Sequence, residues 1–481
     1  MFPRALLALA LTAAPAVAGE PFALSADALS LPGLQEITTR DPAAPYRVGV
    51  NMLRTLPTSP GLATPAEVLA DVRAAGGQGL RQVQAGDVGW FALARPGGGP
   101  LDFAQADPWL LNDQGLYPIP TLYQIGPAAA ARFWGGACPA EGASPDPHCR
   151  EPFTPDGVPL DLRRRDVRAA ASAYVTEVAR HYQGSGLHHY EVMNEPERFR
   201  HHDLGLAYTY RWGPRQYARL LTLTRAALRA VDPEAVVVAG GAVWYDQHPA
   251  GGRQEMWEDY LDTALAHGAA AALDVVNVHY YGPWPGLAEH LGEARALMAQ
   301  HGIAEKPLWL TEVGSSATSG SPGEQAADIF RYLSVAFGEG VALVNWHTHL
   351  SSTDAPRGWG GYGLRQARGR RHPAWYAFRL FASKLGNFGT CAPLARGAGG
   401  VWAYRYSGAL HPALGTMTPA WVLWSSREDA TYDLGPELLT EGAQVEVIQV
   451  VPDARGYFSA HTQPASEPIA LGPAPVLVLA R

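Results

Sequence analysis

Eight short apolar runs of β-prone residues recur along most of this chain, with amphipathic stretches of helical periodicity between them. The apolar runs cover residues 46–52, 80–85, 117–123, 189–193, 235–240, 274–280, 307–311 and 341–347. The helical stretches cover residues 65–75, a short one near 104–112, and then 166–182, 214–230, 255–266, 287–301, 324–337 and 373–385. A strand followed by a helix, repeated many times, is typical of parallel strands joined by helical crossovers. Eight such pairs predict an α/β fold, a (β/α)8 TIM barrel.

From about residue 388 the helical periodicity stops. Apolar runs at residues 401–406, 421–425, 445–451 and 476–480 alternate with turn residues, which predicts a C-terminal antiparallel β-sandwich domain. We therefore expect a barrel over residues 46–387 and a β-domain over residues 388–481. Residues 19–45 form an N-terminal segment that can supply a strand to the β-domain.

The N-terminus has the form of an export signal. Arg4 precedes an apolar run over residues 5–13, and Ala16-Val17-Ala18 matches the small-x-small pattern of a signal-peptidase site. We interpret residues 1–18 as a cleaved signal peptide; the alternative is an anchored or disordered N-terminus. A spanning helix needs about 20 apolar residues, and no segment reaches that length. The mature chain is expected to be secreted or periplasmic, without a membrane span.

Charge and cysteine content narrow the class of protein. The 481 residues carry a formal net charge of −8 and contain no Lys/Arg-rich block, so the electrostatic footprint of a nucleic-acid-binding protein is missing. Cys138 and Cys149 lie close together in a Pro/Gly-rich stretch and are predicted to form a disulfide, which leaves Cys391 unpaired. Three scattered cysteines do not predict a metal site, and no cofactor is expected. The oligomeric state stays open.

Two glutamates follow the ends of the predicted fourth and seventh strands. Pro196 cannot donate to a sheet and restricts the residue before it, so the fourth strand should end at Glu195. Gly314 lets the chain leave the seventh strand just after Glu312. Barrel enzymes carry their chemistry at these strand ends, and hydrolysis of an acetal with retention needs two carboxyl groups about 5–5.5 Å apart. The sequence therefore predicts that Glu195 and Glu312 cleave a glycosidic bond.

The flanking motifs resemble those of a known enzyme group. Asn194-Glu195-Pro196 and Thr311-Glu312 resemble the paired signatures of glycoside hydrolase clan A, the retaining (β/α)8 enzymes. A strand-two arginine, a strand-six His-x-Tyr and a strand-eight tryptophan agree with that pattern. The resemblance covers about residues 46–390, and the β-domain is similar to those of families 39 and 30, with family 39 preferred.

The resemblance implies roles for the matching residues. Glu195 would be the acid/base and Glu312 the nucleophile. Asn194 would bind the sugar 2-hydroxyl, and Arg81 would pair with Glu312. For Arg81 the alternative is a structural ion pair with the same partner. Glu191, which lies deeper in the same strand as Glu195, is expected to be structural or solvated.

Strands six and eight supply further candidates. Tyr281 would donate a hydrogen bond to the nucleophile, and His279 would contact the substrate or a neighbouring side chain. Trp346 would offer a flat apolar face to a pyranose ring; satisfied core side chains are the alternative for all three. His347 and His349 form a His-x-His that could bind a metal. No strand-one His-x-His joins them, so no metal is expected.

The predicted function is a secreted retaining glycoside hydrolase that cleaves a poly- or oligosaccharide. Met193, where many relatives have an aromatic residue, and Val313-Gly314-Ser315 depart from the clan pattern, so sugar, linkage and endo or exo action stay open. Two alternatives remain. One is a transglycosylase that uses the same carboxylates, and the other is a non-catalytic carbohydrate-binding barrel, which would not need both acids.

Overall fold

The computed structural model describes residues 22–29, 31, 44–52, 64–82, 88–94, 99–123, 161–199, 213–244, 255–318, 320–351, 360–411, 416–435 and 443–481. The predicted signal peptide and the predicted Cys138–Cys149 disulfide lie outside these residues. Cys391 lies among them and is a free thiol.

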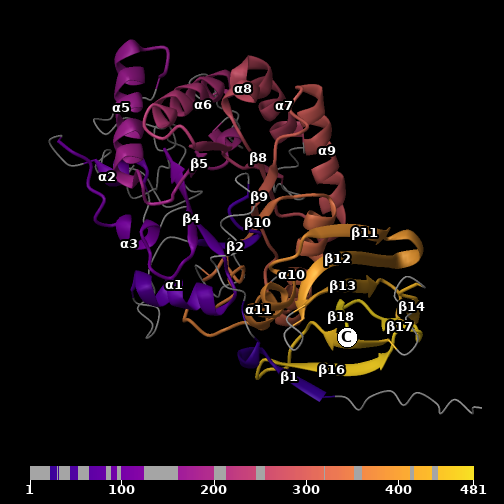
Figure 1. Ribbon diagram of the computed structural model, residues 1–481. Coiled ribbons are helices and arrows are strands. Elements are labelled where there is room, and N and C mark those ends of the chain that lie inside the picture. Colours follow the sequence, from indigo (N-terminus) through magenta and orange to yellow (C-terminus); the bar gives the residue numbers. More distant parts are fainter. Residues whose placement is uncertain are drawn as a thin grey trace, which may run out of the picture.

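Nine parallel strands of the described residues form one curved sheet. They are β2 (Val48–Met52), β3 (Gly79–Gln82), β4 (Tyr117–Leu122), β5 (His189–Val192), β6 (Val236–Ala239), β7 (Ala242–Trp244), β8 (Val276–Tyr280), β9 (Leu308–Val313) and β10 (Leu343–Trp346). The spatial order is β6-β5-β4-β3-β2-β10-β9-β8-β7. Only Gly240 and Gly241 separate β6 from β7, and a parallel bridge joins Val238 of β6 to Val275 before β8. The two short strands are thus one interrupted barrel strand, and the sheet closes into the predicted eight-stranded barrel (Figure 1).

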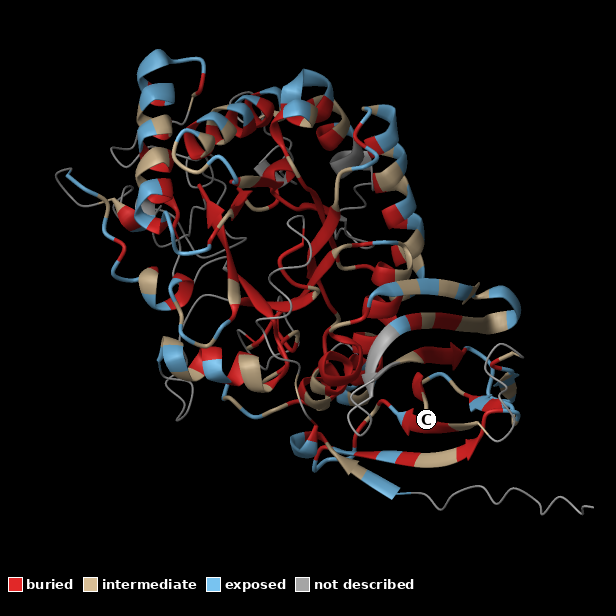
Figure 2. Ribbon diagram, in the orientation of Figure 1, coloured by how far each residue is buried: buried red, intermediate tan, exposed pale blue. Residues whose placement is uncertain are grey.

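Helices surround the barrel. The long ones are α1 (Pro65–Ala74), α5 (Arg165–Tyr182), α6 (Pro214–Arg229), α7 (Glu255–Ala264), α9 (Leu287–Gln300), α10 (Pro322–Gly338) and α11 (Pro373–Leu385). Shorter ones are α2 (Trp90–Leu93), α3 (Asp107–Leu110) and α8 (Ala270–Ala272). Figure 2 shows that their buried sides face the strands. Each helical stretch predicted from the sequence is a helix, and no helix of the described residues is long and apolar enough to cross a membrane.

The C-terminal part is an antiparallel sandwich beside α10 and α11 (Figure 1). Its large sheet contains β1 (Phe22–Ser25), β16 (Tyr457–Pro464), β15 (Gln444–Gln449), β18 (Val476–Ala480), β13 (Thr416–Ser425), β12 (Val401–His411) and β11 (Thr390–Arg396), in that spatial order. A two-stranded sheet of β14 (Ala430–Tyr432) and β17 (Ile469–Leu471) forms the second layer. In β13, Trp421 and Leu423 pack in the sandwich core, while Val422 and Trp424 pack with the barrel helices. The β-sandwich prediction is confirmed.

Side chains inside the barrel change from apolar to polar along its axis. Near the amino ends of the strands they form an apolar layer of Tyr46, Ile119, Val238, Val275, Trp309 and Leu343. Further along the same strands lies a polar layer of Asn51, Arg81, Thr121, Glu191, Asn277, Thr311 and Asn345, all buried. Because inward residues recur with a period of two, β4, β8, β9 and β10, or the residue just before them, contribute to both layers through the pairs 119/121, 275/277, 309/311 and 343/345. The apolar layer closes the barrel beneath the polar one.

Gly79 tests the packing of the apolar layer. A Cβ on Gly79 would lie 2.1 Å from the ring of Tyr46, so we expect Gly79→Ala to lower the free energy of unfolding by about 1–3 kcal/mol. Gly292→Ala is the control, because this exposed position in α9 has no atom within 4 Å of a new Cβ. The control should gain about 0.5–1 kcal/mol from helix propensity. Urea unfolding followed by circular dichroism compares the two variants, and equal stabilities would contradict the packing.

Candidate active site

Arg81, fully buried at the end of β3, is the centre of the polar layer. Its Nε and Nη2 both donate to Glu191, with an Nη2–Oε1 distance of 2.7 Å, and its Nη1 donates to Glu312. Nη1 also lies 3.1 Å from Asn51 Oδ1, and Nη2 lies 2.6 Å from Asn194 Oδ1. Burial alone would lower the pKa of Arg81, but Glu191 and Glu312 raise it above its usual value. One charged guanidinium therefore joins the ends of β3, β5 and β9.

Glu191 is the deeper of the two carboxylates, with no exposed surface. Besides Arg81, its Oε1 accepts from Gly241 N at 3.3 Å and from Asn277 Nδ2 at 3.1 Å. Asn277 also binds Thr311, with an Nδ2–Oγ1 distance of 2.7 Å. The hydrogen bonds of Glu191 thus go to the barrel interior, which is a structural position.

A register irregularity in β9 turns Glu312 towards the carboxyl-end mouth of the barrel. The pairing of β9 shifts against β8 after Val278 and against β10 after Val344. As a result the neighbours Thr311 and Glu312 both face inward, whereas strict alternation would send one of them outward. Thr311 stays in the polar layer, and Glu312 lies above it.

A hydroxyl and two imidazole rings surround the second oxygen of the Glu312 carboxylate. The Tyr281 hydroxyl donates to Oε2, and the Nδ1 atoms of His347 and His279 lie 3.4 Å and 3.7 Å from the same oxygen. Burial raises the pKa of Glu312, but His279, His347 and Arg81, together with the Tyr281 hydroxyl, outweigh it and hold the pKa well below its usual range. Glu312 is therefore ionised at neutral pH.

Glu195 lies where the chain turns away from β5. Met193 and Glu195 have φ angles of 66° and 47°, in the left-handed region that costs energy for residues other than glycine. The chain then forms a short 3-10 turn, η4 (Pro196–Phe199), in which Glu197 accepts a 2.8 Å hydrogen bond from a backbone N–H of β7. Glu195 itself is buried, and its Oε1 lies 3.1 Å from His279 Nδ1.

Glu195 and Glu312 meet across a short gap. One carboxylate oxygen of each, and one ring nitrogen of His279, all lie within 4.8 Å of one another. Retaining glycosidases hold their carboxyl groups about 5–5.5 Å apart and inverting ones about 6.5–9.5 Å apart. The spacing fits the retaining class. The same three groups are also close enough to hold a cation.

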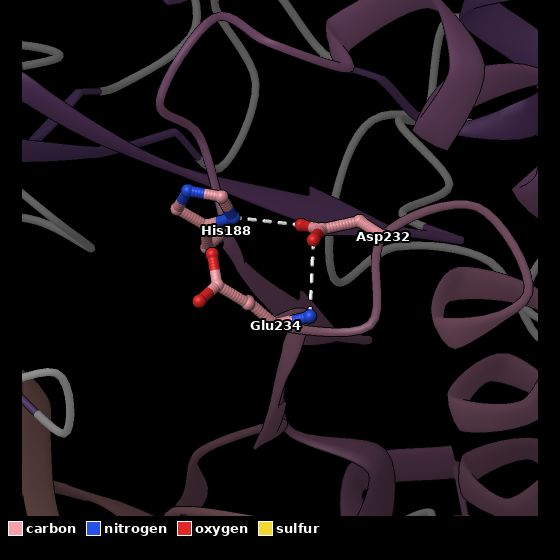
Figure 3. A group of neighbouring side chains, drawn as sticks. All are labelled: His188, Asp232 and Glu234. Carbon is pink, nitrogen blue, oxygen red and sulfur yellow. Dashed lines mark hydrogen bonds and ion pairs between the residues drawn. The ribbon is translucent and has the colours of Figure 1, made fainter.

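A second group of possible metal ligands lies at the amino ends of the barrel strands. Figure 3 shows its three side chains. His188 precedes β5, and Asp232 and Glu234 precede β6. Asp232 Oδ2 lies 2.7 Å from His188 Nδ1, and Asp232 Oδ1 accepts from Glu234 N at 3.0 Å. These contacts join two strand starts at a partly exposed position.

Trp346 does not lie with the polar side chains of the mouth. It has no exposed surface, its ring packs 6.0 Å from that of Tyr332 in α10, and its indole N–H donates to Tyr362 O at 3.3 Å. The prediction that Trp346 offers its face to a sugar ring is therefore contradicted by its burial on the helix side of β10. The other predicted residues, which do converge at the mouth, are Glu195, Glu312, Asn194, Arg81, His279 and Tyr281.

The two histidines after Trp346 point to different groups. His347 approaches Glu312, whereas His349 Nε2 lies 3.0 Å from Asp71 Oδ2 of α1. They do not form a common pair of ligands. Sequence reasoning missed the proximity of His347 to Glu312. Residues 343, 345 and 347 lie two apart along the last strand and therefore face the same side. This alternation could have predicted that His347 approaches Glu312.

Comparisons with known proteins agree with this geometry. A family model described as "Cellulase (glycosyl hydrolase family 5)" matches residues 160–352, which include both glutamates. No curated protein matches the chain in sequence. A family 39 glycoside hydrolase from Bacteroides cellulosilyticus WH2 superposes with a TM-score of 0.59 and 16% identity over 92% of this chain and 82% of its own.

Two further structures share the fold. A family 39 β-xylosidase from Caulobacter crescentus has a TM-score of 0.52 and 17% identity, covering 90% of this chain and 99% of its own. An α-L-arabinofuranosidase from Thermotoga maritima has a TM-score of 0.53 and 13% identity, covering 92% of this chain and 97% of its own. The family model supports the predicted resemblance to clan A, and the solved structures show that the chain shares the fold of family 39 enzymes.

Removal of Arg81 tests the charge balance of the barrel. We expect Arg81→Met to lower the free energy of unfolding at pH 7 by about 3–5 kcal/mol, because two buried carboxylates would lose their counter-charge. A carboxyl group whose pKa is depressed by folding stabilises the protein above its unfolded pKa, and this contribution is lost as the pH falls. The difference between the variant and the wild type should therefore shrink towards pH 3.

The matched control is Arg163→Met, because Arg163 is exposed and pairs with Asp161 at the surface. This change should leave the urea midpoint at the wild-type value. A stability loss for Arg81→Met that is equal at pH 7 and pH 3 would contradict the charge argument.

Proposed function

We propose that this chain is an O-glycosidase of glycoside hydrolase clan A that hydrolyses its substrate with retention, with Glu312 as nucleophile and Glu195 as acid/base. The supporting observation is the gap of at most 4.8 Å between one oxygen of each carboxylate. Their surroundings also differ. Arg81 and Tyr281 donate to Glu312, whereas Glu195 lies against the His279 ring. One carboxyl group must be ionised to act as nucleophile while the other is protonated to act as acid, and different environments allow this.

In the first step a Glu312 oxygen attacks the anomeric carbon while protonated Glu195 gives its proton to the glycosidic oxygen. The bond between the anomeric carbon and that oxygen breaks, and the leaving group departs as an alcohol. Glu312 is then esterified to the sugar, and Glu195 is ionised.

In the second step Glu195 takes a proton from a water molecule, and the water oxygen attacks the anomeric carbon. The ester bond to Glu312 breaks, and both carboxyl groups return to their first states. Two inversions at one carbon give net retention.

The neighbouring residues support this chemistry in distinct ways. Arg81 keeps Glu312 charged and directed, and Tyr281 fixes its second oxygen. Asn194 accepts from Arg81 through Oδ1, so its NH2 group is the end that would donate to the sugar 2-hydroxyl. His279 bridges Glu195 and Thr311, with its Nε2 at 3.0 Å from Thr311 Oγ1, and would hold the acid/base in place.

The substrate is proposed to be a poly- or oligosaccharide, which the chain would meet outside the cytoplasm if residues 1–18 are a signal peptide. A β-xylosidase and an α-L-arabinofuranosidase share the fold. Pentosides are therefore the first substrates to test, followed by hexosides and by plant, fungal and bacterial polysaccharides.

The two glutamates can be told apart with azide and a reactive aryl glycoside. Glu195→Ala should lose about 10²–10⁴-fold in the rate on substrates that need an acid, and azide should accelerate it and give a glycosyl azide of retained configuration. Glu312→Ala should be inactive and, with azide, give the inverted glycosyl azide. The configuration of the products is measured by proton NMR.

Two results would contradict the assignment of Glu312 as nucleophile. One is a Glu312→Gln variant that is as active as the wild type, and the other is a wild-type product of inverted configuration.

The low pKa of Glu312 predicts the acid side of the pH profile. The nucleophile must be ionised in the free enzyme, so kcat/KM should fall only as the pH drops below the ordinary glutamate value of about 4.3. Tyr281→Phe removes a donor to the ionised carboxyl and should move this limb to higher pH, while the limb on the alkaline side stays in place. Initial rates, corrected for stability at each pH, test this. An acid limb that Tyr281→Phe leaves unmoved would contradict the assignment.

A further inference from the structure

We propose that His347, and not Trp346, is the strand-eight side chain that borders the reacting sugar, where it positions Glu312 for attack. The inference rests on the function proposed above and adds a positioning residue to that site. It follows from the register of β10, the contacts of Glu312 and the surroundings of the imidazole.

The register of β10 turns His347 inward and Trp346 outward. Leu343 lies in the apolar layer of the barrel, and Asn345, two residues on, accepts a 2.9 Å hydrogen bond from the Tyr46 hydroxyl inside the barrel. His347 continues this inward series, because side chains two residues apart face the same side of a strand. Trp346 has the opposite parity and packs among the helices.

His347 approaches the oxygen of Glu312 that Tyr281 also contacts. Its Nδ1 lies 3.4 Å from Oε2, while Arg81 occupies Oε1. Hydrogen bonds of a catalytic site are often long before substrate binds and tighten in the complex. A small movement of either group would make this contact a hydrogen bond to the nucleophile.

Two aromatic rings fix the orientation of the imidazole. The rings of Tyr281 and Tyr362 meet it edge-on, at centroid distances of 5.4 Å and 5.9 Å and interplanar angles of 88° and 73°. His347 is only 4% exposed. The ring is therefore directed at Glu312 by packing, as a positioning group must be.

The electrostatic setting suits a neutral donor. Burial lowers the pKa of His347, and the charges of Glu312 and Glu195 only partly oppose this. The titratable and charged groups that face Glu312 are Arg81 of β3, Glu195 after β5, His279 and Tyr281 at the end of β8, and His347 after β10. A neutral N–H can orient the carboxylate without adding a second full cation that would hold back its attack.

His290 shows what a purely structural histidine looks like in this chain. It is 1% exposed in α9, and its ring packs 5.3 Å from that of Tyr280. Burial lowers its pKa to about 3. His290 is therefore the matched control for the loss of a buried imidazole away from Glu312.

The test compares His347→Leu with His347→Asn. The two new side chains have nearly the same shape, but only asparagine has a hydrogen-bond donor close to the position of the histidine Nδ1. The probe is the 4-nitrophenyl glycoside that the wild type hydrolyses fastest, from a panel of pentosides and hexosides. We expect kcat of His347→Leu to fall about tenfold to hundredfold, because the variant loses a hydrogen bond to a charged group. KM should change little. Its acid limb should move to higher pH, and His347→Asn should recover most of the rate and the profile.

Trp346→Phe and His290→Phe should keep the wild-type kcat and pH profile even where their melting temperatures fall. If His347→Leu does not melt cooperatively, His347→Phe, which keeps the ring contacts, replaces it in the comparison. Equal kcat and pH profiles in the Leu and Asn variants would overturn the inference, as would a large kcat loss in Trp346→Phe at unchanged melting temperature.

Glu312→Gln separates this inference from the proposed function. If Glu312→Gln is inactive while the His347 variants match the wild type, only the role of His347 falls. If Glu312→Gln turns over like the wild type, or the wild type is inert towards the whole panel and towards polysaccharides, the proposed function falls and the role of His347 falls with it.

Discussion

The pairing of Arg81 with Glu191 and Glu312 is the interaction on which the rest of the site depends. A guanidinium inside a barrel has lost its water, and only well-directed carboxylates and amides compensate for that loss. The chain supplies Glu191 as a bidentate partner and Asn51 as a further acceptor. The apolar layer around Trp309 closes the barrel below. Arg81 therefore ties the charge of Glu312 to the core of the fold, and His279, His347 and Tyr281 add to this at the mouth.

Small residues and local strain give the side chains of the mouth their positions. A Cβ on Gly241 would lie 2.0 Å from His279 Nε2, and one on Gly240 would lie 2.6 Å from the carbonyl oxygen of Met193. The interruption between β6 and β7 is therefore what lets His279 reach Glu195. The left-handed backbone at Glu195 has the same effect from the other side, because it directs the carboxyl group across the gap towards Glu312.

The sequence predicted the parts of this structure that have local signals. Gly314, which follows the end of β9 at Val313, marks an element end as predicted, whereas β5 ends at Val192 and not at Glu195. The convergence of residues 195 and 312 followed from placing both at carboxyl ends of parallel strands. Trp346 was wrongly expected to contact the sugar, because the resemblance assigned that role to a tryptophan in the eighth strand. It did not take into account whether position 346 faces the inside of the barrel or the helices. The irregular pairing around Thr311 has no signature in the sequence, since it depends on three neighbouring strands at once.

The β-domain also bears on the geometry of the site, through the segment that follows β8. Directly after Tyr281, the Gly282 carbonyl accepts a 2.6 Å hydrogen bond from Tyr332 of α10. Two residues later, Trp284 packs edge-on against Trp402 and Trp424 of the β-domain, with ring centroids 4.9 Å and 5.5 Å away. Aromatic pairs of this kind favour one relative orientation of the rings. The residue that contacts the nucleophile is thus followed by a segment held by both a barrel helix and the sandwich, so the packing of the two parts limits how far Tyr281 can move from Glu312.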